Sequence, residues 1–469
     1  MSFLIVLGAL CFLMFVAYRG YSVILFAPLA AMGAVFFTDP SLVAPMFTGL
    51  FMDKMVGFLK LYFPVFLLGA IFGKVIELSG FSKSIVAATI RLLGPHRAIM
   101  AIVLVCALLT YGGVSLFVVV FAVYPFAAEL YRQGDIPKRL IPGAIALGSF
   151  TFTMAALPGT PQIQNIIPTS FFGTDAWAAP ILGTLAAIYV FVLGMVYLEW
   201  RRRSAARAGL GYADAHAGEL HNEPHLFHGE KLPHPLIALL PLLLVGISNK
   251  LFTLWIPMFY GANHSFSPAV IGDVAPVVQE TARIAAIWAV QGALLVGILS
   301  VLILAFKPVK ARFAEGSKAA IGGAMLAGMN TASEYGFGAV IAALPGFLVV
   351  ANALNSIPDP LINEAVTVNV LAGITGSASG GMSIALAAMA DSFIAQANAL
   401  GIPMDVLHRV ASIASSGMDT LPHNGAVITL LAVTGLTHRQ SYKDILAITL
   451  ISTSSVFLVI GAYYLTGWV

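Results

Sequence analysis

The chain has 469 residues, of which 59% are hydrophobic and only 10% are charged. Soluble globular proteins carry about 25% charged residues, so this composition excludes a soluble enzyme, a nucleic-acid-binding protein and a disordered scaffold. The net charge of +3 is too small to indicate an anionic macromolecular partner. A mean hydropathy of +0.92 predicts a polytopic membrane protein in a lipid bilayer.

Eight continuous apolar segments approach the length of about 20 residues that a transmembrane helix needs. They lie near 3–18, 21–37, 58–79, 177–199, 236–257, 284–306, 336–354 and 444–466. Because strands of an outer-membrane barrel are only about ten residues long, these segments predict an all-α protein of the inner (plasma) membrane. Segments 82–94 and 307–331 are interpreted as interfacial or packing helices.

Three further apolar stretches, 98–131, 139–173 and 361–437, are interrupted by Gly, Pro, Ser or Thr at intermediate depth. Irregular backbone is tolerated there only where protein or a water-filled cavity satisfies its N–H and C=O groups. Combined with the Lys and Arg content of the loops, these stretches predict re-entrant hairpins at 98–131 and 361–399. Interrupted helices follow at 139–173 and 403–437, which gives ten crossings, or fourteen if the hairpins cross fully.

The two halves contain similar motifs in the same order. Four matches at offsets of 264 to 270 residues include Gly112-Gly113-Val114-Ser115-Leu116 with Gly380-Gly381-Met382-Ser383-Ile384, and Met154 to Pro158 with Met418 to Pro422. We predict two inverted repeats, 1–200 and 235–469, joined by a cytoplasmic linker at 201–234. Each repeat has about five crossings, one hairpin and one interrupted helix, an arrangement typical of secondary transporters.

The hairpin tips are the first candidate substrate site. A helix that begins at such a tip carries about half a positive charge at its N-terminus, which favours a bound carboxylate. Glycines there allow close backbone approach, and serines supply hydroxyl groups. The candidate residues are Gly112, Gly113, Ser115, Ser377, Ser379, Gly380, Gly381 and Ser383. The alternative is that these small residues only allow helices to pack closely.

The interrupted helices supply the other candidates. Three prolines and a glycine prevent a regular helix across 158–168, and the polar groups beside them are expected to bind substrate oxygens. The substrate-binding candidates are Thr153, Gly159, Thr160, Gln162, Asn165, Thr420 and Asn424.

Asp419 and His423 are the candidate proton-coupling residues, because a charge at the membrane centre costs about 2.5–3.5 kcal/mol and is usually functional. The alternative for Asp419 is a cap on the half-helix after Pro422. Asp391 and Glu334 are weaker candidates, and Glu334 is expected near the cytoplasmic face in contact with solvent.

No nucleotide-binding or hydrolase motif appears, so neither a cofactor nor ATP-driven transport by this chain is predicted. Five histidines gather in the linker, at His216, His221, His225, His228 and His234. Without cysteines or regular ligand spacing they are more typical of a solvated loop than of a metal site.

The stretch GSFTFTMAALPGTPQIQN at 148–165 and the stretch DTLPHNG at 419–425 resemble the gluconate permease family of the ion transporter superfamily. The resemblance implies proton-coupled import of a small hydroxy-monocarboxylate such as gluconate, glycerate, 3-hydroxybutyrate or D-serine. It also implies a homodimer with a fixed scaffold and a mobile transport domain that carries both hairpins. The first stretch resembles the 3-hydroxybutyrate branch more than it resembles the gluconate carriers.

Three alternatives remain open at this point. A sodium-coupled organic anion symporter is the nearest, because the carbonyl groups of broken helices also coordinate Na⁺. An anion channel would need a selectivity filter or a ring of charges, which the sequence lacks. An intramembrane enzyme would need a nucleophile beside a base, and only the region of Asp419 and His423 is comparable.

Overall fold

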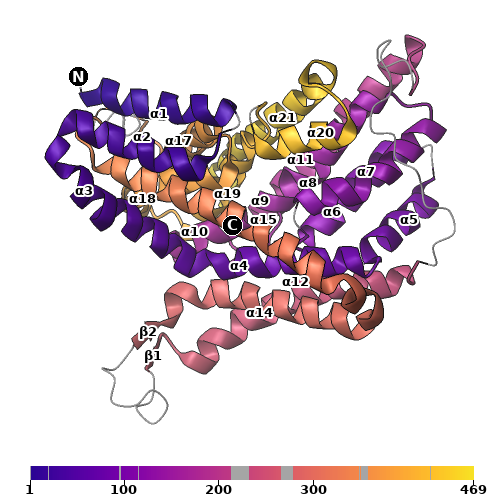
Figure 1. Cartoon of the computed structure of the whole chain (residues 1–469), viewed down its shortest axis with the longest axis horizontal. Helices are drawn as coiled ribbons and strands as arrows, with labels where there is room; N and C mark the ends of the chain where they lie inside the picture. Colours follow the sequence, from indigo (N-terminus) through magenta and orange to yellow (C-terminus); the bar gives the residue numbers. More distant parts are fainter. Residues whose placement is uncertain are drawn as a thin grey trace.

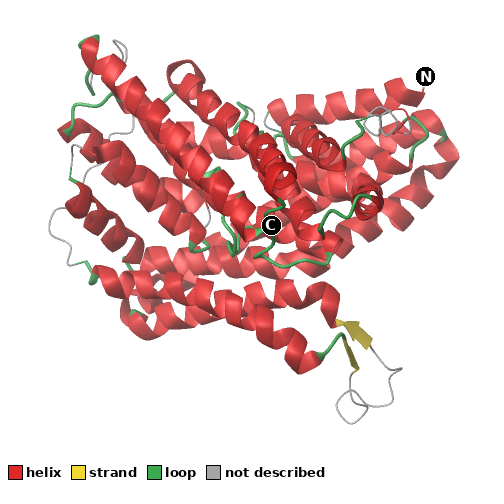
Figure 2. Ribbon diagram, turned by 180° about the vertical axis from the view of Figure 1, so that it is seen from behind, coloured by secondary structure: helices red, strands yellow, loops and turns green. Residues whose placement is uncertain are grey.

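The computed structural model describes residues 2–19, 21–94, 97–114, 116–212, 232–265, 278–347, 349, 357–422 and 424–469. These residues are almost entirely helical, which confirms the predicted all-α membrane fold (Figures 1 and 2). The sheet that they contain has two short antiparallel strands, β1 (Asn263–Ser265) and β2 (Val278–Glu280). Ser115, His423 and most of the predicted linker lie outside the described residues.

The first half begins with paired helices α1 (Ser2–Tyr18) and α2 (Val23–Thr38). A helical stretch without a break then runs through η1 (Pro40–Leu42), α3 (Val43–Met46), η2 (Phe47–Met52) and α4 (Asp53–Leu78). The segment expected at 58–79 is therefore the second part of a helix of 39 residues. The short helix α5 (Phe81–Leu93) follows, where a packing helix was expected.

Helices α6 (Ala98–Tyr111) and α7 (Leu116–Gln133) pack against each other and form hairpin 1. The interrupted helix comes next, as η4 (Lys138–Leu140), α8 (Ile141–Ser149), α9 (Phe152–Ala155) and α10 (Ile163–Phe172). It breaks at the segment that contains Pro158, Gly159 and Pro161, since proline cannot continue the backbone hydrogen bonds of a helix. The long helix α11 (Pro180–Arg207) ends the first half.

The second half also begins with a pair of helices. Helices α12 (Pro235–Tyr260) and α14 (Thr281–Leu304) pair along one edge of the molecule (Figure 1). Then come α15 (Phe306–Ala343) and hairpin 2, which consists of α17 (Pro360–Thr375) and α18 (Ala378–Ala399). The second interrupted helix is α19 (Met404–Gly417) with α20 (Gly425–Thr434), and α21 (His438–Thr466) is the last helix.

The 38-residue helix α15 differs from its sequence prediction. It joins the expected interfacial helix at 307–331 to the expected span at 336–354, and it ends at Ala343 because Leu344, which precedes Pro345, is extended. Glycines let α15 pack along η2 and α4: a Cβ at Gly336 would lie 2.9 Å from the backbone oxygen of Phe51 in η2. That α15 is one unbroken helix could not be predicted from the sequence, because the continuity depends on packing against α4.

Within the described residues, six helices are long and apolar enough to cross a membrane. They are Pro40–Leu78, Pro180–Arg207, Pro235–Tyr260, Ile284–Leu304, Ala378–Ala399 and His438–Thr466, and shorter apolar helices accompany them at Ser2–Leu13, Val23–Thr38, Ala98–Tyr111 and Gly425–Thr434. The two halves interlock at the breaks. The broken helix α10 packs against hairpin arm α18, and the broken helix α20 packs against hairpin arm α7.

Candidate functional site

The tip of hairpin 2 is a tight turn that only small residues permit. Gly376 ends α17 with φ +68°, a left-handed conformation that favours glycine. Ser377 caps α18, and its Oγ accepts a hydrogen bond from the Gly380 backbone N at 3.1 Å. A Cβ at Gly381 would lie 2.2 Å from the backbone of Ala372, so the two arms touch at this glycine.

Asp419 and Asn424, from the second interrupted helix, hold this tip in place. The Oδ1 of Asp419 accepts hydrogen bonds from the Ala378 backbone N at 2.9 Å and from Asn424 Nδ2 at 2.8 Å. Asn424 Nδ2 also donates to the Gly376 carbonyl oxygen at 2.7 Å. Asp419 therefore lies at the N-terminus of α18, where the helix dipole favours a carboxylate.

The cap on α20 is Asn424, whose Oδ1 accepts hydrogen bonds from the backbone N of Ala426 at 2.6 Å and of Val427 at 3.3 Å. The alternative role considered for Asp419, a cap on the half-helix after Pro422, is therefore wrong, because another side chain performs it.

Glu334 is buried against the same tip. Its side chain extends from α15, only 3% of the residue is exposed, and its Oε2 has no hydrogen-bond partner among the described residues. A Cβ at Gly380 would lie only 1.6 Å from this oxygen, so glycine alone fits there. The expectation of a solvent-exposed Glu334 near the membrane face is wrong, because α15 begins earlier than predicted and places Glu334 well inside the helix.

Six residues around the tip form what we call the hairpin 2 cluster: Thr331, Glu334, Ser377, Ser379, Asp419 and Asn424. Glu334 interacts with the Ser377 hydroxyl and, through space, with Asp419, and Thr331 Oγ1 lies 3.2 Å from Ser379 Oγ. No Lys or Arg of the described residues forms an ion pair with either carboxylate. Two buried and unpaired negative charges are costly, so the cluster favours a bound proton or cation.

Three predicted substrate ligands use their hydroxyls within the protein instead. Ser383 Oγ donates to the Ser379 carbonyl oxygen at 2.6 Å, and Thr153 Oγ1 donates to that of Gly148 at 2.7 Å. Thr420 Oγ1 pairs with Thr449 Oγ1 at 2.5 Å. Because all three side chains are also fully buried, the structure does not present them to a ligand.

Hairpin 1 is joined to the first interrupted helix in a similar way. Gln162 Nε2 donates to the carbonyl oxygens of Thr110 at 2.7 Å and Val114 at 3.3 Å, on either side of the tip. Gly113 at the tip has φ +95°, and a Cβ there would lie 3.1 Å from Pro161. Gln162 thus fastens the tip of hairpin 1 to the broken helix, as Asn424 fastens that of hairpin 2.

Asn165 lies in a buried junction. Its Oδ1 accepts a hydrogen bond from Arg409 Nη1 at 2.9 Å and lies 3.2 Å from His408 Nε2. Arg409 is fully buried and also donates to the carbonyl oxygens of Ala155 at 2.9 Å and Ala178 at 3.1 Å. Asn165 therefore connects the broken segment to α19. Of the other candidates, Thr160 is buried, and its Oγ1 has no partner among the described residues.

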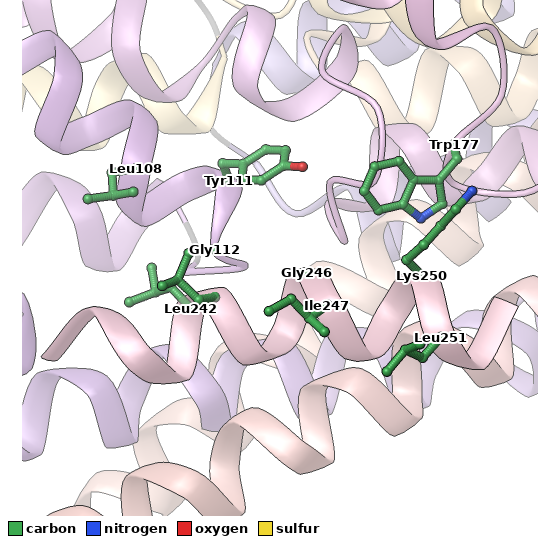
Figure 3. A pocket seen from close by; sticks show the side chains of 10 residues that line it. Leu108, Tyr111, Gly112, Trp177, Leu242, Gly246, Ile247, Lys250 and Leu251 are labelled. Carbon is green, nitrogen blue, oxygen red and sulfur yellow. The ribbon is translucent and has the colours of Figure 1, made fainter. Parts of the chain in front are cut away.

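A groove of about 420 Å³ lies between hairpin 1 and α12 (Figure 3). Its lining includes Tyr111 and Gly112 at the tip, Trp177 before α11, and Lys250 on α12. Gly112 is required at this contact, since a Cβ there would overlap Leu242. Tyr111, Trp177 and Lys250 are not among the site residues predicted from the sequence. A lone lysine in the apolar helix α12 was a visible signal, but its position beside Trp177 depends on the fold.

Among the described residues, no group of three or more His, Cys, Asp or Glu side chains is arranged to hold a metal ion. The candidate site thus consists of an acidic cluster at the tip of hairpin 2 and a groove with one cationic side chain at the tip of hairpin 1.

Comparisons with known proteins identify the class. The YdaH transporter of Alcanivorax borkumensis, known from a crystal structure, superposes with a TM-score of 0.50, covering 89% of this chain and 88% of that one at 15% identity. The chain therefore has the fold of a membrane transporter. It is also 56% identical, over 477 residues and the full length of both chains, to the uncharacterized transporter YxjC of Bacillus subtilis.

The chain belongs to the family of the transporter YxjC. Its activity is therefore transport, not enzymatic catalysis, and the prediction of a multi-pass membrane protein is confirmed. No family model matches the chain.

Proposed function

We propose that the protein is a secondary active transporter that imports a small hydroxy-monocarboxylate by proton symport. The resemblance to the gluconate permease family suggests 3-hydroxybutyrate, gluconate or a similar acid as the substrate. The observation that carries the proposal is the hairpin 2 cluster, in which two buried carboxylates, Glu334 and Asp419, meet a hairpin tip.

Each carboxylate has a distinct part in the proposed mechanism. Asp419 accepts two hydrogen bonds and keeps its charge at the N-terminus of α18. Of these two carboxylates, Glu334 has an oxygen without a partner among the described residues, and in this proposal it takes up the transported proton. Loss of that proton would place two negative charges at one hairpin tip, and their repulsion would open it. The half-buried residues Ser377 and Ser379 have their Oγ atoms 3.5 Å apart at the tip, and in this proposal opening exposes these hydroxyls to the substrate.

The arrangement of elements supports two inverted repeats. Five helical elements of the first half begin 258 to 266 residues before a counterpart in the second half: Pro40 and Phe306, Ala98 and Pro360, Leu116 and Ala378, Ile163 and Gly425, and Pro180 and His438. In this proposal the hairpins and broken helices move together as a transport domain in each subunit of a homodimer, while other helices form the scaffold.

A sodium-coupled symporter is the second candidate. The hairpin 2 cluster offers hydroxyl and carboxylate oxygens, which are the ligands that hard cations prefer. One experiment distinguishes proton-coupled from sodium-coupled symport. Purified protein in proteoliposomes, free of sodium, receives substrate while an external pH electrode records the medium. Substrate-induced alkalinisation supports proton symport. Uptake that requires sodium and leaves the external pH unchanged would contradict it.

A further inference from the structure

Lys250 is a charged residue deep within a membrane-spanning helix. It lies 15 residues after Pro235 and 10 before Tyr260, the ends of α12. At about 1.5 Å per residue these separations are about 22 Å and about 15 Å along the helix axis. The hydrocarbon core of a bilayer is about 30 Å thick, so Lys250 lies near its middle. The side chain is nevertheless exposed and lines the groove beside hairpin 1.

The charge of Lys250 has only one electrostatic partner among the described residues. Its Nζ lies 5.0 Å from the centroid of the Trp177 ring, and it forms no ion pair with any described carboxylate. Trp177 is fixed in place, because its Nε1 donates to Asn249 Oδ1 at 2.8 Å and its ring packs on Gly159. A cation–π contact offsets part of the desolvation of an ammonium group, and an anion would offset much more.

We propose that Lys250, Trp177 and Tyr111 form a subsite for the carboxylate of the transported substrate. Figure 3 shows Tyr111 and Trp177 on opposite sides of the groove, with Lys250 extending beside the indole. The Tyr111 hydroxyl donates to the Pro158 carbonyl oxygen at 2.9 Å, so Tyr111 contributes its ring to the wall of the subsite. The carboxylate would accept hydrogen bonds from Lys250 Nζ, and the carbon chain would lie along Leu108, Ile247 and Leu251. This subsite deepens the proposed function and rests on it.

The lining also indicates which acids the groove accepts. Apart from Lys250, Tyr111 and Trp177, the groove is lined by leucines, isoleucine and glycines. A polyhydroxylated acid would leave several hydroxyls without partners against these walls, which costs binding free energy. A short acid with an apolar end fits the lining, and about 420 Å³ is ample for four to six carbons. An anionic lipid is disfavoured, since its phosphate lies at the membrane surface and Lys250 lies near the middle.

The test measures equilibrium binding of labelled butyrate and 3-hydroxybutyrate to the full-length protein in nanodiscs of phosphatidylcholine. Lys250→Gln should weaken binding at least about tenfold, the loss expected for a charge-assisted contact. Lys250→Arg should remain within a few-fold of the wild type. Lys310→Gln is the matched control, because Lys310 lies on α15, outside the groove, with its Nζ 5.6 Å from the Phe306 ring centroid. It should bind as the wild type does.

Two results would overturn the subsite. One is wild-type affinity in a folded Lys250→Gln variant. The other is a loss that appears only when phosphatidylglycerol is present, which would make Lys250 a lipid contact. If Lys250→Gln does not fold, butyramide replaces it as the probe, and equal affinity of the wild-type protein for butyrate and butyramide would refute the proposal. Normal uptake by Lys250→Gln would refute the subsite and leave the proposed transport function intact. Absence of uptake by the wild-type protein would refute the proposed function itself.

Discussion

Replacing Glu334 with glutamine separates the coupling of transport from the folding of the protein. Glutamine has the shape of glutamate, so its side chain can still interact with the Ser377 hydroxyl, and its amide fits against Gly380 as the carboxylate does. The substitution removes no hydrogen bond from Oε2, which has no partner among the described residues. We therefore expect the free energy of unfolding to change by less than about 1 kcal/mol.

The effect on coupling should be large. A pH gradient of one unit supplies about 1.4 kcal/mol per proton, which drives about tenfold accumulation in a one-to-one symporter. Wild-type protein in proteoliposomes should approach that ratio, whereas Glu334→Gln should only equilibrate the substrate across the membrane. Exchange of labelled for unlabelled substrate should persist in the variant, because exchange needs no net proton movement.

The control is Glu77→Gln, which changes a glutamate that pairs with Lys74 on α4, away from the hairpin 2 cluster. It should accumulate substrate as the wild type does. Accumulation at the wild-type level in Glu334→Gln would refute the assignment of Glu334 as the proton carrier. Loss of exchange together with accumulation would indicate a structural role instead.

Three further predictions follow from individual contacts. Asp419→Asn should fold, because an amide oxygen can still accept both hydrogen bonds, but it should lose accumulation in the same proteoliposome assay; wild-type accumulation would exclude Asp419 from coupling. Gly381→Ala should lower the thermal unfolding temperature and the uptake rate, because its Cβ would lie 2.2 Å from the Ala372 backbone. Gly373→Ala is the control and should be tolerated, because the nearest atom would lie 3.5 Å from its Cβ. Equal effects of the two substitutions would contradict the tight contact at Gly381. Arg409→Lys should destabilise the fold by about 1–3 kcal/mol, because the buried Ala178 carbonyl oxygen loses its guanidinium donor, whereas that of Ala155 keeps the Ser412 hydroxyl. Thermal unfolding measures this, and an unchanged unfolding temperature would contradict the junction.

The breaks in the fold could be predicted because single residues determine them. Pro158 and Pro161 interrupt the first broken helix, and Pro422 lies in the break of the second. Glycines mark both hairpin tips, since Gly113 and Gly376 have backbone conformations that other residues rarely adopt. These are local properties of the chain, and they do not require knowledge of what packs nearby.

The partners of each side chain could not be predicted in the same way. Serine and threonine often donate to the carbonyl of a preceding helical turn, as Ser383 does, and the sequence does not reveal which of them do. Thr420 instead pairs with Thr449, on a helix that only tertiary packing brings near. The burial of Glu334 likewise depends on α15 packing against α4 and hairpin 2.

The central claim, proton-coupled import of a hydroxy-monocarboxylate, is tested most directly by uptake into sodium-free proteoliposomes under an inward proton gradient. Labelled 3-hydroxybutyrate and gluconate are compared, each with and without a protonophore. We predict accumulation above equilibrium of at least one of them, abolished by the protonophore. Accumulation that survives the protonophore, or that begins only when sodium is added, would contradict the account.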